Sequence, residues 1–450
     1  MRVRRRTASG RRHRLPPRRR GSVAHRRARE RAPRRPGRSA GARRASEEPA
    51  RLREPTDRGG PSRGLRAGSG RDRVRGTPPS ERLRIVVIGP LRYPLRQPHA
   101  GGLEAMVWDR VQQLRQRGHE VTLCAVQGSD FLEGSPPEFV MPGVQWLSDA
   151  DASDTDYPVG YVKRASRSLE NALAYIRRHD DRFDVIDNHC LQGPPIAAAA
   201  SLGVPVVTTL HTPPLPEMLA AHAASIGSTQ RFLAVSAHTA RAWRQHGVHA
   251  EVMPNSVDLD RWPLGKGGDA LVWSGRIVPE KGTHLAIDAA RMTGRTLVVA
   301  GRIGDRDYFD QQVAPRLGGD VRYVGPLPQA ELADLVGRSA CALVTPLWDE
   351  PFGLVIPEAL ATGTPVVAFD AGGVGESIAP LPSALVPPGD VRALAEAASH
   401  AASLGSAHPE TRWLTRRTAE RRFDAQGRAH ALEQLFRQVV DESTTMEISA

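Results

Sequence analysis

The chain has 450 residues and a formal net charge of +13, a length sufficient for two domains with additional segments. Its three cysteines lie in apolar surroundings and form no CxxC pattern, which indicates free core thiols in a reducing compartment. No stretch is long and apolar enough to span a membrane, which argues against a membrane-spanning protein and favours a soluble or peripheral one.

Residues 1–82 carry the positive charge. They contain 28 arginines, no lysine and seven acids, a net charge of +21, so the remaining 368 residues carry about −8. Proline, glycine and serine are frequent and apolar periodicity is missing, so this basic segment is predicted to be disordered. It also lacks the apolar core of a secretory signal. One interpretation is a polybasic arm that contacts anionic lipid or nucleic acid. We favour a disordered tail, or sequence translated from a misplaced start codon.

The first folded pattern is a βαβ unit. A buried strand at 84–89 is followed by an amphipathic helix at 103–114 and a second strand at 120–126, which predicts a parallel sheet. Gly101 and Gly102 open the helix, where glycines let backbone N–H groups approach a phosphate. The dinucleotide fingerprint GxGxxG is absent, and a plain turn is the alternative for the glycine pair.

Further strands continue this sheet. Residues 129–160 are predicted to loop over the surface, and a helix is predicted near 168–179. Strands at 183–189 and 204–212 then end in His189 and His211, and the carboxyl ends of parallel strands line a ligand crevice. A lone histidine is more often structural, so the residue type alone does not assign a site.

A second run of alternating strands and helices begins after the linker-like residues 263–268. The predicted strands are 270–275, 296–301, 321–325, 341–346, 365–369 and 384–386. Two successive Rossmann-like halves imply a cleft between them, the usual place for a ligand. Arg276 and Lys281 bracket the first strand-to-helix turn of this half and suit a diphosphate, although solvated surface charge is the alternative.

Residues 349–367 read as a turn, a short helix and a buried strand, with Glu350 and Glu358 eight positions apart. Eight helical residues span roughly 12 Å, more than the ~5–9.5 Å between paired glycosidase carboxylates. This spacing favours two hydroxyl-rich ends of one long ligand, such as a sugar, a diphosphate and a ribose. Two solvated carboxylates on a surface turn are the alternative.

The last part of the chain, about 409–440, has apolar residues at roughly helical spacing, and we expect them to pack in the core. They are Trp413, Leu414, Phe423, Leu432, Leu435, Phe436, Val439 and Val440.

Glu350 and Glu358, with Phe352 and Gly353 after the first, resemble the E-x7-E signature of retaining glycosyltransferases of family 4, which have the GT-B fold. The resemblance covers residues 83 to about 440 and includes the S-G-R…K-G pattern at Arg276 and Lys281. It also includes Pro-Asn-Ser-Val-Asp at 254–258, where the family has glycine in place of Ser256.

The resemblance implies an α/β protein with two Rossmann-like domains facing each other across a cleft. Residues 83–262 would form the acceptor domain and 263–410 the nucleotide-sugar donor domain. The C-terminal helices, 411–450, would partly cross back to the first domain. In the family, the glycine-rich loop matching Gly101-Gly102 faces the donor phosphates.

The resemblance also implies the roles of individual residues. Glu358 would accept hydrogen bonds from ribose hydroxyls, and Glu350 would hold hydroxyls of the donor sugar. The histidine matching His211 lies beside the transferred sugar, and His189 matches another frequent family histidine. The expected catalytic residues are Glu350 and His211, and the expected donor-binding residues are Gly102, Arg276, Lys281, Phe352, Gly353, Leu354 and Glu358.

The predicted reaction is therefore glycosyl transfer, with retention, from a nucleotide sugar such as a UDP- or GDP-sugar to an unidentified glycan, lipid or small-metabolite acceptor. No side chain stands out as a covalent nucleophile, which fits front-face attack. We expect no cofactor and no metal, no specific nucleic acid, and a cytoplasmic location with peripheral membrane contact as a variant. The alternatives are a non-catalytic nucleotide-sugar-binding protein, or a nucleic-acid or membrane binder acting through the basic segment. A dehydrogenase is a weaker alternative because GxGxxG is absent.

Overall fold

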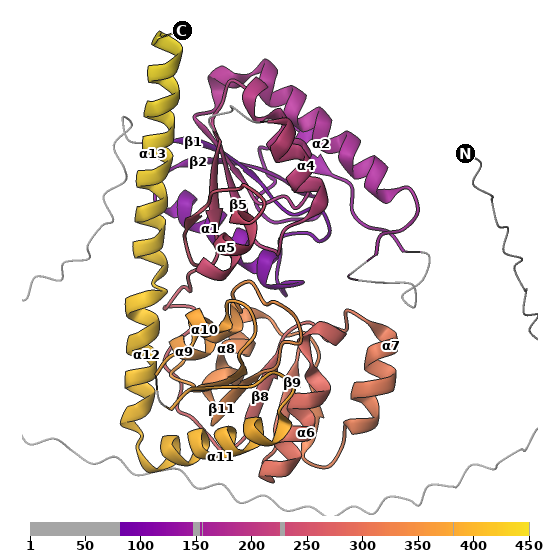
Figure 1. The fold of residues 1–450 in the computed structure, drawn as a ribbon, viewed down its shortest axis with the longest axis vertical. Helices are drawn as coiled ribbons and strands as arrows, with labels where there is room; N and C mark the ends of the chain where they lie inside the picture. The colour runs from indigo at the N-terminus through magenta and orange to yellow at the C-terminus, as the bar shows by residue number, and fades with distance from the viewer. Residues whose placement is uncertain (1–81, 147–153, 155, 226–229, 381, 450) are drawn as a thin grey trace, which may run out of the picture. The chain divides into compact units, whose positions relative to one another are not determined.

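The computed structural model describes residues 82–146, 154, 156–225, 230–380 and 382–449. Apart from residue 82, the basic segment with its predicted disorder lies outside these residues. Within the described part of the chain, the strands form two parallel sheets, one in each half of the folded region (Figure 1).

The first sheet has the strand order β3-β2-β1-β4-β5-β6-β7. Its strands are β1 (Arg84–Ile88), β2 (Glu120–Val126), β3 (Val140–Met141), β4 (Val185–Asn188), β5 (Val206–Leu210), β6 (Arg231–Ala234) and β7 (Glu251–Val252). Its helices are α1 (Gly102–Gln116), α2 (Tyr161–Arg178), α3 (Pro194–Ala198), α4 (Pro216–Ala224) and α5 (Ala237–Arg244).

The second sheet has the order β10-β9-β8-β11-β12-β13. Its strands are β8 (Leu271–Ser274), β9 (Leu297–Ala300), β10 (Val321–Tyr323), β11 (Cys341–Val344), β12 (Val366–Phe369) and β13 (Ala384–Val386). Its helices are α6 (Thr283–Thr293), α7 (Arg306–Tyr308), α8 (Gln329–Gly337), α9 (Val355–Ala361), α10 (Val374–Ser377) and α11 (Val391–Ala407).

The strand orders of the two parallel sheets confirm the predicted α/β fold class with two Rossmann-like halves. The central strands β1, β4, β5 and β12 are buried almost along their whole length, which is why β1 and β12 read as nearly continuous apolar runs rather than alternating ones. Each predicted strand of the second half lies within two residues of its observed bounds. The three cysteines are buried and free, as expected.

One predicted surface loop is partly wrong. Within residues 129–160, Val140 and Met141 form β3 at the edge of the first sheet, with Val126 opposite Met141. Phe139 and Met141 are fully buried. The strand has only two residues, too few for the alternation of apolar and polar side chains that marks a strand in a sequence.

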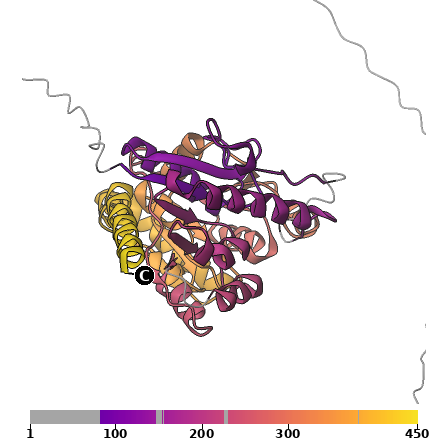
Figure 2. The same cartoon turned by 90° about the horizontal axis from the view of Figure 1, so that it is seen from above.

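The chain ends in two long helices that pack on different halves (Figures 1 and 2). Helix α12 (Glu410–Arg422) joins the core of the second half through Ala419, and Phe423 follows it there. Helix α13 (Ala425–Ser449) places Leu432 and Phe436 in the core of the first half. No helix in the described residues is long and apolar enough to cross a membrane.

The prediction that Trp413 and Leu414 pack in the core is wrong, because they are 59% and 63% exposed. The buried face of α12 is formed instead by Arg412, Thr415 and Ala419, which follow one another at helical spacing.

Candidate active site

A cleft of about 420 Å³ lies between the two sheets. Loops that follow β1 and β5 line it from the first half, and loops that follow β8, β9 and β11 line it from the second. In both sheets the strand order reverses beside the first strand, and such switch points hold ligands at the carboxyl ends of strands. The volume suits a nucleotide-sized ligand.

The cleft brings together all the residues expected in the site. It is lined by Gly102, His211, Arg276, Lys281, Glu350, Phe352, Gly353, Leu354 and Glu358, among others.

Glu350 is held by a cation and an indole. Its Oε2 accepts hydrogen bonds from Lys281 Nζ at 2.5 Å and from Trp348 Nε1 at 2.7 Å, and the residue is only 8% exposed. The loop around it is tight, because a Cβ on Gly372, whose φ is +65°, would lie 2.4 Å from the Glu350 carbonyl oxygen. The carboxylate is therefore fixed in one place.

Glu358 lies inside helix α9, which begins only at Val355. As the sequence predicts, Glu350 stands in the turn before the helix, so the two glutamates are not separated by eight helical residues. Burial, with the neighbouring Asp109 carboxylate as a further cause, raises the pKa of Glu358 to about 8. The Glu358 side chain is therefore largely protonated at neutral pH in the unliganded protein.

This raised pKa predicts a pH-dependent stability. Between pH ~4.5 and ~8 the folded state binds a proton at Glu358 that the unfolded state has lost. The free energy of unfolding should therefore fall as the pH rises through this window, by at most roughly 1.4 kcal/mol per pH unit. Urea unfolding at pH 5, 6, 7 and 8 should give a smaller decline for Glu358→Gln than for the wild type. Glu396→Gln, which changes an exposed pair on α11, is the matched control. Parallel curves for wild type and Glu358→Gln would contradict the assignment.

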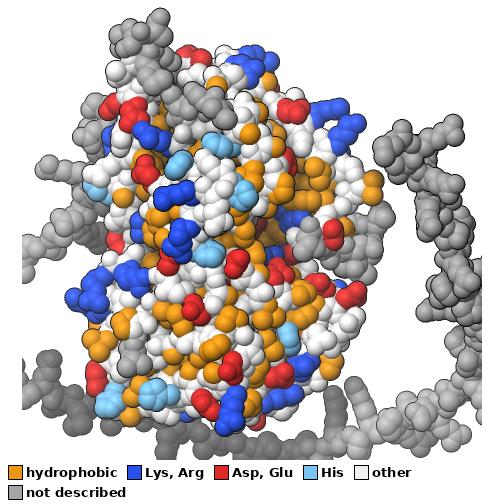
Figure 3. Space-filling model, in the orientation of Figure 1, with side chains coloured by type: hydrophobic (Ala, Val, Ile, Leu, Met, Phe, Trp, Pro, Cys, Tyr) orange, Lys and Arg blue, Asp and Glu red, His pale blue; other side chains and the backbone are white. Residues whose placement is uncertain are grey.

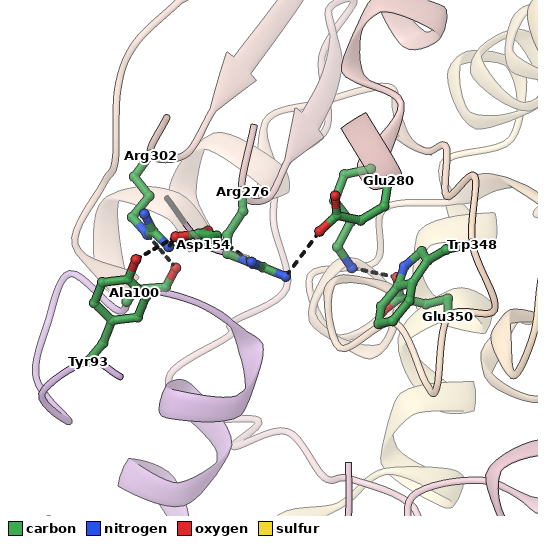
Figure 4. A network of polar contacts seen from close by, with 9 residues as sticks. Tyr93, Ala100, Asp154, Arg276, Glu280, Arg302, Trp348 and Glu350 are labelled. Atoms are coloured by element: carbon green, nitrogen blue, oxygen red, sulfur yellow. Dashed lines mark hydrogen bonds and ion pairs between the residues drawn. The ribbon is translucent and has the colours of Figure 1, made fainter. Parts of the chain in front are cut away.

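Arg276 is engaged by carboxylates (Figure 4). Its Nη1 donates to Asp154 Oδ2 at 2.9 Å, and its Nη2 lies 3.8 Å from Glu280 Oε1. Neither Arg276 nor Lys281 is therefore solvated surface charge, and an incoming anion would have to compete with Asp154 and Glu350 for them.

Two further residues of this network, Arg302 and Asp154, were missed in the sequence. Arg302 donates from Nη2 to both oxygens of Asp154 at 2.5 Å and from Nε to the Ala100 carbonyl at 2.9 Å, which links the two halves. Tyr93 also donates to Asp154 (Figure 4). Arg302 follows β9 at the carboxyl edge of the sheet, which is a signal that could have identified it. Asp154 lies in the predicted loop and has no such signal.

Asp154 is ionised in this network. Burial alone would raise its pKa, but the hydrogen bond and positive charge of Arg302, with Tyr93 and Arg276, outweigh burial and lower the pKa below its ordinary value. The Asp154 carboxylate thus lies between Arg276 and Arg302 of the second half, at a position where a phosphate group of a ligand could make the same contacts.

His211 and Gly102 enter the cleft from the first half. His211 follows β5, and burial, followed by the charges of neighbouring groups, lowers its pKa well below the ordinary value. Gly102 opens α1, and a Cβ there would lie 3.6 Å from the Leu354 Cβ of the second half. The start of α1 therefore lies directly against the loop that carries Phe352 and Gly353.

Charges of both signs lie side by side on the face seen in Figure 3. Among the residues with described positions, no three His, Cys, Asp or Glu side chains group closely enough to hold a metal ion.

Two family descriptions match the folded part of the chain. Glycosyltransferase Family 4 matches residues 100–261, and Glycosyl transferases group 1 matches residues 258–412. Each therefore covers one of the two halves that contain the parallel sheets.

Individual proteins give a consistent picture. The glycogen synthase of Mycobacterium tuberculosis is 41% identical over 138 residues, 28% of this chain and only 33% of that protein. The D-inositol 3-phosphate glycosyltransferase of Frankia alni is 30% identical over 342 residues, 64% of this chain and 82% of that protein. Among solved structures, Anabaena Alr3699/HepE in complex with UDP and glucose has a TM-score of 0.59 at 20% identity, covering 79% of this chain and all of that one.

The likeness to the solved structure concerns the fold, whereas the match to the Frankia protein extends over most of that protein's length at 30% identity. With two Rossmann-like halves facing a shared cleft, the chain belongs to the glycosyltransferases of the GT-B fold.

Proposed function

We propose that this protein is a retaining glycosyltransferase that moves a sugar from a nucleoside diphosphate sugar to a hydroxyl group of an acceptor. The observation that carries the proposal is the composition of the cleft, where the carboxyl groups of Glu350 and Glu358 lie together with the cations Arg276 and Lys281. Carboxyl oxygens suit sugar hydroxyls, and fixed cations suit a diphosphate. The Anabaena protein, solved with UDP and glucose, makes a UDP-sugar the first donor to test.

In this proposal Glu358 accepts hydrogen bonds from the ribose hydroxyls of the donor. Glu350 holds hydroxyls of the sugar, aided by backbone N–H groups of residues 352–354. Arg276 and Lys281 bind the diphosphate, together with the backbone N–H groups at the start of α1, where Gly102 permits close approach.

Transfer would break the bond between the anomeric carbon and the phosphate oxygen. The acceptor oxygen would form its bond to the same face of that carbon, and the acceptor proton would pass to the departing phosphate oxygen. Arg276 and Lys281 would stabilise the negative charge that develops on the leaving group, and His211 would lie beside the transferred sugar. This scheme uses protein cations for charge neutralisation and calls for no metal or other cofactor.

In this proposal the acceptor binds against the first half, which contributes Tyr157 and Gln192 to the lining of the cleft. These side chains offer hydrogen-bonding groups for a polyhydroxylated acceptor. The Frankia relative is named for an inositol phosphate acceptor, so a small polar metabolite is the first acceptor class to test, ahead of glycans and lipids.

Calorimetric titration of the full chain with UDP-, GDP-, ADP- and dTDP-sugars tests the donor site. We expect one nucleotide class to bind, and Glu358→Ala to weaken that binding because the ribose loses its hydrogen-bond acceptor. Glu396→Ala, in an exposed ion pair of α11, should bind like the wild type. Equal affinities of Glu358→Ala and wild type would refute the ribose assignment, and no binding by any class would refute the donor site.

A non-catalytic nucleotide-sugar-binding protein would pass the binding test. Release of nucleoside diphosphate from the bound donor, measured with a panel of hydroxylated acceptors, separates the two functions. Binding without release under all these conditions would favour the non-catalytic protein.

Asp154→Asn is expected to strengthen the binding of a nucleoside diphosphate about tenfold. The phosphate would then displace a neutral amide from Arg276 and Arg302 instead of a paired carboxylate, and a charge-assisted hydrogen bond contributes about 1.5–3 kcal/mol. Calorimetry with UDP, or with the nucleotide found in the donor screen, measures the change. Asp156→Asn makes the same charge change at an exposed residue nearby and is the control. Weaker or unchanged binding by Asp154→Asn would show that Asp154 does not compete with the phosphate.

A further inference from the structure

Behind His211, buried side chains form a continuous row that the proposed reaction does not use. Asp187 Oδ2 lies 3.1 Å from His189 Nε2, and His189 Nδ1 lies 2.9 Å from His211 Nε2. Asp187 and His189 are fully buried, whereas His211 lines the cleft. The row therefore leads from the interior of the first half to the site.

The strand register produces this row. Strands β4 and β5 are parallel neighbours with Asn188 opposite Thr208. His189 directly follows β4 and His211 follows β5, so both side chains lie at the same edge of the sheet.

The charges at the inner end are already balanced. Arg110 Nη1 lies 3.3 Å from both carboxylate oxygens of Asp187. Burial would raise the pKa of Asp187, but its contacts with His189 and with the Arg110 guanidinium lower it below its ordinary value, so Asp187 is ionised. A protonated His189 would be a second cation in this buried site without a second anion, and burial lowers the pKa of His189 despite Asp187. His189 is therefore neutral.

The charge of Asp187 favours one arrangement of protons, although the 3.1 Å contact between His189 Nε2 and Asp187 Oδ2 is close electrostatically without having hydrogen-bond geometry. His189 must carry its proton on Nε2, because a lone pair there would face the carboxylate of Asp187. Its Nδ1 is then an acceptor, so His211 must donate from Nε2. The remaining ring nitrogen of His211, Nδ1, is left with a lone pair.

We propose that Asp187 and His189 are positioning residues that fix His211 as the Nε2–H tautomer, so that its Nδ1 accepts a hydrogen bond from a hydroxyl of the bound sugar. The same logic orients catalytic and metal-binding histidines, where a buried carboxylate selects the tautomer. The hydroxyl-selecting role rests on the proposed donor site, whereas the tautomer itself does not. A sugar that lacks this hydroxyl, or carries fluorine in its place, has no donor for Nδ1 and is discriminated against.

The tautomer can be observed directly in the full chain labelled with 15N-histidine. Long-range 1H–15N spectra should show His211 protonated at Nε2 and unprotonated at Nδ1 from pH 6 to 8, with the signals assigned by His211→Asn and His189→Phe. A 15N–15N coupling through the hydrogen bond should join His211 Nε2 to His189 Nδ1, a signature that tight packing alone does not produce. A proton on His211 Nδ1, or on His189 Nδ1, would overturn the proposal.

The selection can be tested with the donor and its monodeoxyfluoro analogues. In the wild type we expect one fluorinated position to weaken binding about tenfold more than the others. In His189→Phe, that fluorinated position should weaken binding no more than the others, so the ratio between these effects should fall towards one, because His211 is no longer fixed. The control His222→Phe, which changes a histidine on α4, should keep the wild-type ratio. An unchanged ratio in His189→Phe would overturn the selecting role. If no nucleotide sugar binds at all, the donor-site proposal and this selecting role both fail, and the spectra still decide the tautomer.

Discussion

Replacing Lys281 by methionine, or Arg276 by alanine, is expected to lower turnover of the nucleotide sugar at least tenfold. Each change removes a charge-assisted contact to the diphosphate, and such contacts contribute about 1.5–3 kcal/mol. The loss should be larger in kcat than in binding, because negative charge develops on the phosphate as it leaves. Initial rates of nucleoside diphosphate release measure it.

The structure adds a complication for Lys281 that the experiment has to separate. Lys281 Nζ pairs with the 8%-exposed Glu350, so its removal leaves a nearly buried carboxylate without a cation. Adding Glu350→Gln to Lys281→Met should restore thermal stability, and the turnover of the double variant should stay well below that of Glu350→Gln alone. Equal turnover of the double variant and of Glu350→Gln alone would mean that Lys281 is needed only to pair with Glu350.

Lys266 and Arg392 provide matched controls, because both are exposed on the second half away from the cleft. Lys266→Met and Arg392→Ala should keep wild-type kinetics. Unchanged kinetics in Lys281→Met or Arg276→Ala would remove that residue from the site.

Arg412→Met is expected to destabilise the protein by about 1–3 kcal/mol, the cost of leaving a buried hydrogen-bond acceptor without its donor. Arg412 is only 9% exposed, and its guanidinium donates to the carbonyl oxygens of Gly265, Gly337, Ser339 and Thr362 at 2.8–3.2 Å. Burial lowers its pKa to about 10, which still leaves it charged at neutral pH. Without it, the carbonyl groups of Gly265 and Ser339 lose this donor, whereas those of Gly337 and Thr362 still accept from the backbone N–H groups of Gly267 and Gly265.

Thermal and urea unfolding followed by tryptophan fluorescence measure this effect, since Trp262 and Trp273 are buried in the second half. Arg412→Lys keeps the charge with fewer donors and should fall between wild type and Arg412→Met. Arg417→Met, on an exposed position of the same helix, is the control. A loss below about 1 kcal/mol in Arg412→Met would show that water replaces the guanidinium at these carbonyls.

The fold could be predicted from the sequence, and so could the nine expected site residues that line the cleft, because both depend on local patterns. Buried parallel strands are short apolar runs, and their carboxyl ends line the crevice wherever the sheet places them. Glu350 and Lys281 could thus be assigned to one cleft before either was seen there. The two-residue strand β3 was missed because its strand conformation depends more on pairing with β2 than on the β-propensity of its own two residues.

The ionic state of the site was decided by tertiary structure alone. Asp154 meets Arg276 122 positions away and Arg302 148 positions away, and no local pattern encodes a contact at that separation. The same holds for Arg412, whose carbonyl partners lie on segments 50 to 147 positions away. A pKa is set by burial and by neighbouring charges, so the protonated state of Glu358 and the tautomer proposed for His211 follow only once distant segments have packed around them.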